Sequence, residues 1–195
     1  MPSLMIKLKQ GIWPLHQQLE QSLDLLNPRF SVADYRRLIA AFWGYYRPLE
    51  AQLQAHQALR EGLPDLAQRA KLPLLEADLL ALGHAEAPPR LPVCGDLPVC
   101  NTLDQAFGCL YVMEGATLGG QVLCRHFNQT LGLDTHNGSA FFAGYGEATG
   151  AMWALFGERL TAANLDETAV IQAAGETFQT LGQWLRPAIL FSGDT

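Results

Sequence analysis

His16 and Glu20 have the residue types and the spacing to hold a metal-containing group. They lie four positions apart in a stretch with helical periodicity, so the carboxylate can accept a hydrogen bond from the imidazole Nδ1. A metal-bound histidine often donates its second ring nitrogen to a carboxylate in this way, which fixes the tautomer and the orientation of the ring. A surface His–Glu pair has the same spacing, and this pattern alone leaves both interpretations open.

The stretch 108–127 is rich in glycine, although its other residues favour a helix. It has no proline and several leucine, valine and methionine residues, yet it carries four glycines. Each glycine inside a helix costs about 1 kcal/mol relative to alanine. On a helix Gly115 stacks on Gly119 and Ala116 stacks on Gly120, so these positions form a flat face without large side chains. Such a face either packs closely against another helix or contacts a broad, flat ligand.

Other patterns that carry chemistry are missing from the sequence. It contains neither a Gly-x-Ser-x-Gly motif nor a glycine-rich phosphate loop. Glu50 and Glu114 lack a histidine three residues further on, which argues against a di-iron carboxylate site. Because His16 has no second metal ligand nearby, a metal at this position would take its other ligands from a cofactor, and heme is the obvious case.

The remaining histidines and all four cysteines show no pattern typical of a site. The histidines lack partner residues at a useful spacing, so we expect them at the surface or half-buried. The cysteines are spaced too widely for a zinc knuckle, and we expect reduced thiols without a metal. The residues concerned are His56, His84, His126, His136, Cys94, Cys100, Cys109 and Cys124.

The composition predicts one domain, residues 1–195, of a cytoplasmic protein. Hydrophobic residues make up 49% of the chain and charged residues 16%, with a net charge of −6. Without a basic run, this charge argues against nucleic acid or an anionic membrane surface as a partner. The sequence has neither an apolar run of about 18 residues nor an N-terminal signal pattern, so we expect no membrane association.

Hydrophobic periodicity predicts an all-α fold, a compact bundle of six or seven helices. No stretch alternates β-branched and polar residues between turn signals. Ser31 is a suitable N-cap with Asp34 three residues on, and Asp166 can cap the last helix. The predicted helices are 4–26, 31–60, 65–82, 102–131, 148–163 and 166–190, with loops at 83–100 and 132–147.

Three prolines inside these helices predict irregularities. Pro14 removes a backbone hydrogen bond, so the first helix either bends or begins near Trp13. Pro48 predicts a kink in the second helix, and Pro73 is a candidate restart of the third.

Several of these motifs together resemble the heme oxygenase family over nearly the whole chain. The segment Tyr111-Val-Met-Glu-Gly-Ala-Thr-Leu-Gly-Gly-Gln-Val-Leu resembles the distal-helix motif, particularly that of bacterial forms associated with bacteriophytochromes or heme uptake. Leu15-His16 followed by Glu20 is similar to the proximal-histidine segment. Further similar segments are Phe42-Trp-Gly-Tyr-Tyr-Arg-Pro-Leu-Glu50, Phe142-Ala-Gly-Tyr-Gly146 with Met152-Trp153, and Thr177-Phe178 with Trp184-Leu185.

The resemblance implies a fold in which heme lies between a proximal helix and a kinked distal helix. His16 would be the axial metal ligand, and Glu20 would orient its ring. Lys9, two turns before the histidine, and Tyr111, which opens the distal motif, would hold the heme propionates. Pro14 affects this assignment, because a kink there would move Lys9 away from the face of His16.

On the distal side, the resemblance assigns the catalytic contribution to the helix backbone. Gly115, Gly119 and Gly120 would let the backbone approach the heme closely and leave room for ordered water. Ala116 would line the same pocket, at the position where animal heme oxygenases carry an aspartate that orders water. Bacterial relatives also lack that aspartate, so this difference does not argue against activity.

The implied reaction is oxidative cleavage of heme b to biliverdin, the IXα isomer, with release of CO and ferrous iron. Heme would be both cofactor and substrate, O2 the oxidant, and a reductase or ferredoxin the electron donor, with a phytochrome as a candidate acceptor of biliverdin. Two alternatives stay open. One is a heme-binding or heme-trafficking protein without turnover. The other is a thiaminase-like or cofactor-biosynthesis relative, which would need acidic or cysteine residues converging on a cavity.

Overall fold

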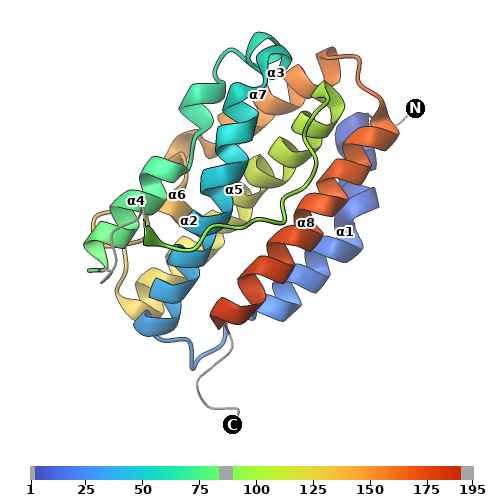
Figure 1. Cartoon of the computed structure of the whole chain (residues 1–195). Helices are drawn as coiled ribbons and strands as arrows, with labels where there is room; N and C mark the ends of the chain where they lie inside the picture. Colours follow the sequence, from blue (N-terminus) through green and yellow to red (C-terminus); the bar gives the residue numbers. More distant parts are fainter. Residues whose placement is uncertain (1–2, 84–89, 190–195) are drawn as a thin grey trace.

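Apolar residues at three- and four-residue spacing form helices whose hydrophobic sides meet in a shared core (Figure 1). The computed structural model describes residues 3–83 and 90–189, and within these ranges it contains helices and no strand, which confirms the all-helical prediction. The helices are α1 Leu4–Leu23, α2 Val32–Ala55, α3 Gln57–Gly62, η1 Leu66–Arg69, α4 Leu72–Ala81, α5 Leu103–Leu131, α6 Ala140–Ala143, η3 Gly146–Ala148, α7 Thr149–Ala162 and α8 Glu167–Ile189.

Helix α1 runs without a break through Pro14. The alternative that it begins near Trp13 is therefore wrong. Proline lacks the N–H that would bond to the carbonyl one turn earlier, but one missing bond does not end a helix that is packed along its length. Because the helix is continuous, Lys9 stays two turns before His16 on the same side of α1.

The predicted helix 31–60 is wrong at one point, because it divides at His56. The imidazole Nδ1 of His56 accepts a hydrogen bond from the Leu59 backbone N–H, so this residue caps α3. The helix does continue through Pro48. The third predicted helix starts as the short 3-10 turn η1 and restarts with Pro73 in the first turn of α4. The predicted loop 132–147 contains the short helices α6 and η3.

The predicted N-caps are confirmed. Ser31 and Asp34 form a reciprocal capping box at the start of α2. The Asp166 carboxylate accepts a hydrogen bond from the Thr168 N–H at 2.9 Å. These bonds satisfy backbone donors that have no partner within the helix.

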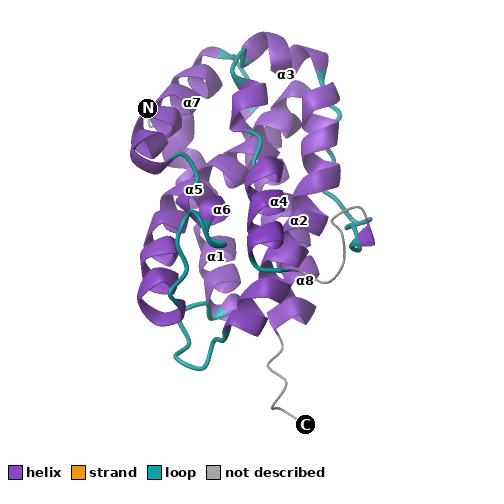
Figure 2. Cartoon of the chain, turned by 90° about the vertical axis from the view of Figure 1, so that its left-hand side faces the viewer, coloured by secondary structure: helices purple, strands orange, loops and turns teal. Residues whose placement is uncertain are grey.

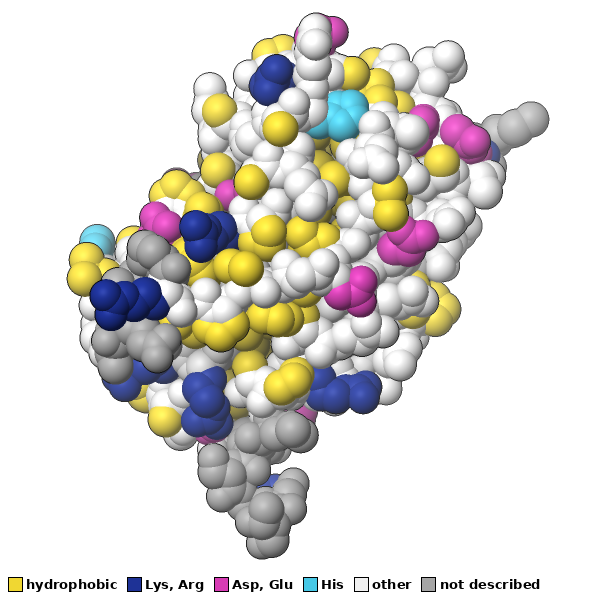
Figure 3. All heavy atoms as spheres, in the orientation of Figure 1, with side chains coloured by type: hydrophobic (Ala, Val, Ile, Leu, Met, Phe, Trp, Pro, Cys, Tyr) yellow, Lys and Arg dark blue, Asp and Glu magenta, His cyan; other side chains and the backbone are white. Residues whose placement is uncertain are grey.

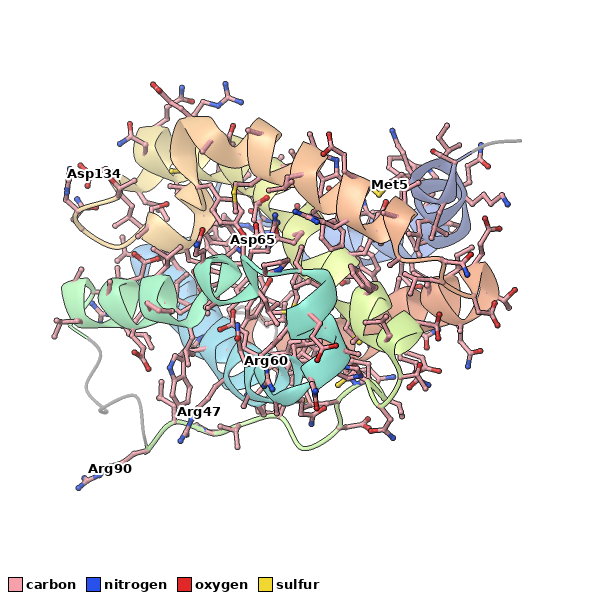
Figure 4. The ribbon with its side chains drawn as sticks, turned by 90° about the horizontal axis from the view of Figure 1, so that it is seen from above. Met5, Arg47, Arg60, Asp65, Arg90 and Asp134 are labelled. Carbon is pink, nitrogen blue, oxygen red and sulfur yellow. The ribbon has the colours of Figure 1, made fainter. Side chains whose placement is uncertain are left out.

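Four helices surround the region where the candidate residues lie. Helix α8 packs against both α1 and α5, and α7 also contacts both of them, so α7 and α8 each bridge α1 and α5. Figures 1 and 2 show these four helices from two sides. Figure 4 shows Met5 where α1 meets α7. A methyl group at Gly157 would lie 3.3 Å from the Met5 Cε, so the two helices approach closely there.

The segment 90–102 crosses the outside of α2 before α5 begins (Figure 1). The Cys94 N–H donates to the Gly44 carbonyl at 2.9 Å, which fixes the segment against the helix. Figure 3 shows hydrophobic side chains across the middle of this face. All four cysteines are free thiols, as expected. Residues 84–89 of the predicted loop, which include His84, and residue 190 of the last predicted helix lie outside the described residues.

Candidate active site

His16 lies in an aromatic setting on α1. Its imidazole stacks on the Trp13 indole with ring centroids 5.6 Å apart and meets the Phe178 ring of α8 edge-on at the same separation. The Nδ1 atom is 3.6 Å from the Glu20 Oε2, so the predicted pair lies together but beyond hydrogen-bonding distance. This nitrogen is shielded from solvent and has no hydrogen-bond partner. A small approach of the exposed Glu20 carboxylate would satisfy it.

Lys9 extends from the same side of α1 and is exposed. It forms no ion pair with any residue in the described ranges. Lys7, by contrast, pairs with Glu167 on α8. Lys9 is therefore the cation on this part of α1 that remains available to an external carboxylate.

Two positions of α5 leave open space beside the helix. A methyl group added at Gly119 would meet no atom within 4 Å. A methyl group at Gly115 would meet only the Trp153 ring of α7, at 3.7 Å. Ala116, next to them on the helix, is exposed. A flat ligand could contact the backbone here without displacing another helix.

Gly108 and Gly120 have the close-packing function that the sequence had left open. A Cβ at Gly108 would lie 2.5 Å from the Val170 carbonyl oxygen of α8. A Cβ at Gly120 would lie 2.6 Å from the carbonyl oxygen of Phe142 in α6. Gly120 thus differs from Gly115 and Gly119, because protein backbone already covers its side of the helix.

Asp78 of α4 fixes the segment that packs on Gly120. Its carboxylate accepts the backbone N–H of Ala140 at 2.7 Å and that of Phe141 at 2.8 Å, at the start of α6. Burial raises the pKa of Asp78 to about 6, although both hydrogen bonds oppose this shift. These bonds hold the Phe142 carbonyl against α5.

Tyr111 is buried one turn before Gly115 and packs against the Trp153 ring, with centroids 5.3 Å apart. Burial raises the pKa of its phenol, which therefore stays protonated near neutral pH. The hydroxyl makes no hydrogen bond to the part of the chain that the structure describes. Within that part of the chain, the Tyr111 hydroxyl is an unpaired donor beside the Trp153 ring.

The other described histidines do not join this site. His56 caps α3, His126 packs against the Phe127 ring, and His136 is exposed in the turn after α5. Among the described histidines, His16 alone lies beside both an aromatic ring of α8, that of Phe178, and a carboxylate, that of Glu20.

Behind the open glycines lies a buried cluster of charged side chains. Glu114 accepts hydrogen bonds from the Arg69 guanidinium, from the Lys71 Nζ at 2.9 Å and from the Tyr145 hydroxyl at 2.7 Å. Arg69 also pairs with Asp65 at 2.7 Å; Figure 4 looks down on this end of the bundle with Asp65 labelled. The cluster ties α5 to η1, to the start of α4 and to the segment before α7.

Electrostatics within the cluster follow from its burial. Desolvation lowers the pKa of the Lys71 ammonium, and the neighbouring Glu114 carboxylate opposes this. Desolvation raises the pKa of Glu50, whose carboxylate accepts the backbone N–H of Lys71 at 2.6 Å and that of Leu72 at 3.3 Å. For Tyr145, burial and the adjacent Glu114 both raise the pKa of the phenol.

The motifs in the sequence do not predict this cluster. Their spacing tests Glu50 and Glu114 only as metal ligands, and it gives no indication of Arg69 and Lys71. A signal was present: Glu114 interrupts a run of apolar residues in the middle of a helix, where a buried carboxylate needs partners.

The residues at this site fit heme. The shielded Nδ1 of His16 lies beside a carboxylate, so the imidazole can be held while its Nε2 binds iron. The space beside the backbone at Gly119 is empty, and any larger side chain at this position would occupy it. Lys9 has no ion-pair partner among the described residues, so its positive charge could be paired with a propionate.

A profile of the heme oxygenase family matches residues 3–187. The chain belongs to this family, whose members are oxidoreductases that degrade heme. No curated protein matched the sequence. The resemblance to the bacterial family members is thus confirmed at the level of the family.

Solved structures show the same fold. Heme oxygenase from Neisseria meningitidis, determined with NO and CO bound, is 24% identical, has a TM-score of 0.81 and covers 100% of this chain and 96% of its own. Heme oxygenase from Leptospira interrogans is 15% identical with a TM-score of 0.78, covering 95% and 100%. Heme oxygenase 2 from Chlamydomonas reinhardtii, solved without heme, is 18% identical with a TM-score of 0.70, covering 95% and 97%.

None of the helices in the described ranges has the length and hydropathy needed to cross a bilayer.

Proposed function

We propose that this enzyme cleaves heme b to biliverdin IXα and releases CO and ferrous iron, using O2 and electrons from a reductase or ferredoxin. The observation that carries the proposal is that α1, which carries His16, and α5, which carries the open glycines Gly115 and Gly119, both pack against α7 and α8. A lone histidine and a bare helix face suit a flat metal complex that brings its own equatorial ligands.

On the proximal side, His16 would bind the heme iron through Nε2, while Glu20 would accept a hydrogen bond from Nδ1. Lys9 and Tyr111 would hold the propionates. When bound, heme supplies the iron that activates O2 and the carbon that is oxidised. By fixing the propionates, Lys9 and Tyr111 would determine which meso carbon is oxidised.

On the distal side, Gly115 and Gly119 let the α5 backbone approach the heme, and the small Ala116 leaves space for water. Water in this space would be the proton source for the oxidation, because Gly115, Ala116 and Gly119 carry no acidic group. Gly120 acts indirectly, because its close contact with Phe142 places α6 beside the site.

The test is reconstitution of the full chain with hemin, followed by a reductant under air. We expect the Soret band to disappear while biliverdin absorbance rises and CO is released. A stable ferrous complex with an unchanged Soret band would instead support a heme-binding protein without turnover.

His16→Ala tests the axial ligand, with His136→Ala as the matched control at an exposed histidine. We expect the first variant to lose the histidine-ligated spectrum and turnover, and the second to keep both. A retained spectrum in His16→Ala would assign the iron to another ligand.

We further propose a cytoplasmic role in chromophore supply, in which a phytochrome accepts the biliverdin. The support is the resemblance of the 111–123 segment to bacteriophytochrome-associated forms. A bacterial apo-phytochrome is added to the reaction, and in parallel to the reaction of a control heme oxygenase. We expect red-absorbing holoprotein to form faster in the first mixture than in the control. Equal rates would remove the support for a dedicated partner.

A further inference from the structure

The imidazole of His16 is restrained on three sides. The Trp13 indole lies nearly parallel to it, with an interplanar angle of 10°. The Phe178 ring of α8 meets it edge-on at 72°. The Glu20 carboxylate lies beside Nδ1. Nε2, the nitrogen proposed to bind iron, makes no hydrogen bond within the described ranges, and unlike Nδ1 it is not among the buried, unpaired atoms.

These restraints differ in stiffness. The Glu20 side chain is 66% exposed and its oxygen is 3.6 Å from Nδ1, so it can rotate away at little cost. The torsion that turns a histidine ring is intrinsically broad, and a carboxylate at this distance narrows it only weakly. A flat indole parallel to the imidazole blocks rotation directly, because a turning ring would strike it.

We propose that Trp13 is a positioning residue for the axial ligand: its indole fixes the plane of the His16 imidazole and thereby aims Nε2 at the heme iron. This inference rests on the proposed heme-binding function. Trp13 sits three residues before His16, so the same turn of α1 carries the ligand and the residue that orients it. Phe178 contacts the same imidazole from α8, so the ring lies against one aromatic side chain of its own helix and one of the neighbouring helix.

The first experiment uses the heme-free full-length protein. The ring current of a stacked indole shifts the His16 ring protons upfield, and we expect Trp13→Ala to abolish that shift. Ile6→Ala is the matched control, because Ile6 is 49% exposed on the same helix and Trp13 is 46% exposed. His16 protons that keep the same shift in Trp13→Ala would overturn the stacking, whatever the protein does with heme.

The second experiment uses the hemin-reconstituted protein, reduced without O2, and records the iron–histidine stretching band by resonance Raman spectroscopy. We expect Trp13→Ala to shift and broaden this band and to weaken heme binding roughly three- to tenfold, the range that one aromatic pair supports. Trp13→Phe should restore most of both, and Ile6→Ala should change neither. A purely structural contribution of Trp13 would alter stability without moving the band.

The outcomes separate the two proposals. In one outcome, Trp13→Ala leaves the iron–histidine band and the heme affinity unchanged, while His16→Ala loses the band. This result would overturn the positioning function of Trp13 and leave the heme-binding proposal intact. A band that survives in His16→Ala would overturn the ligand assignment, and with it the function proposed for Trp13.

Discussion

Gly108 and Gly119 lie on the same side of α5, about three turns apart, yet their surroundings are opposite. At Gly108 the helix is in backbone contact with α8, whereas at Gly119 a side chain would enter empty space. Gly115, between them, faces only the edge of a tryptophan ring. The difference shows that one stripe of small residues is in close helix contact at one end and is left uncovered at the other.

The open part of α5 must be held by something other than α8. Glu114, immediately before Gly115, points into the buried cluster of Arg69, Lys71 and Tyr145. The charged cluster therefore stabilises α5 on the side of Glu114, while the side that carries Gly115 and Gly119 has little protein packed against it. The following changes test this division, in order of decreasing expected effect.

Glu114→Ala should have the largest effect. It leaves the Arg69 guanidinium and the Lys71 ammonium buried without their shared carboxylate, which costs about 3–5 kcal/mol of unfolding free energy. Urea denaturation measures the loss, with Glu158→Ala on the exposed side of α7 as control. A loss no greater than that of the control would mean that the cluster does not hold the open part of α5.

Gly108→Ala should have the next largest effect. The new methyl group would collide with the Val170 carbonyl and the Ala173 Cβ, so the two helices must separate. Overpacking of this kind costs about 1–3 kcal/mol, and the gain in helix propensity offsets only part of it. Urea denaturation of this variant beside Gly119→Ala compares the two ends directly. Equal stability of the two variants would contradict the distinction between them.

Asp78 gives the packed region near Gly120 a pH dependence. Its pKa is about 6 in the folded protein, above the value of about 3.9 expected when unfolded. The folded state therefore binds this proton more tightly, and the stability from Asp78 is complete below about pH 4 and falls as the pH rises to about 6. The difference in unfolding free energy between wild type and Asp78→Asn should decrease over this interval and be constant above it. A difference that grows with pH would show that the ionised carboxylate is the favoured form.

Gly119→Ala should have the smallest effect on stability, with the opposite sign. With no atom in the way, alanine gains helix propensity worth up to about 1 kcal/mol. The same methyl group should weaken heme binding in a hemin titration, because it occupies the surface that the ligand needs. A loss of stability would show that the space is not free, and unchanged affinity would show that heme does not approach Gly119.

The sequence predicts the helices well because periodicity and capping are local. The start of α5 was predicted to within one residue, and the Ser31–Asp34 capping box is present as expected. The break at His56 was missed because neither proline nor glycine marks it; the histidine side chain itself caps the next helix.

For the candidate site, the sequence predicted which residues share a helix face but not what lies opposite. His16 and Glu20 lie together because four residues make one turn. A helical wheel cannot show that Gly120 is covered by protein while Gly119 is not, because the Phe142 carbonyl that covers Gly120 comes from a separate segment. The partners of Glu114 lie at distant positions in the chain, and only the packed structure brings them together.

The packing of α1 against α8 has a consequence for how the protein is made. The helix that carries His16 is the first of the described helices to leave the ribosome, and Phe178, which contacts the histidine ring, belongs to the last. Domains assemble as units during synthesis, and contacts between distant segments form late. The nascent chain therefore carries His16 beside Trp13 of its own helix, but without its contact to Phe178, until α8 has been synthesised.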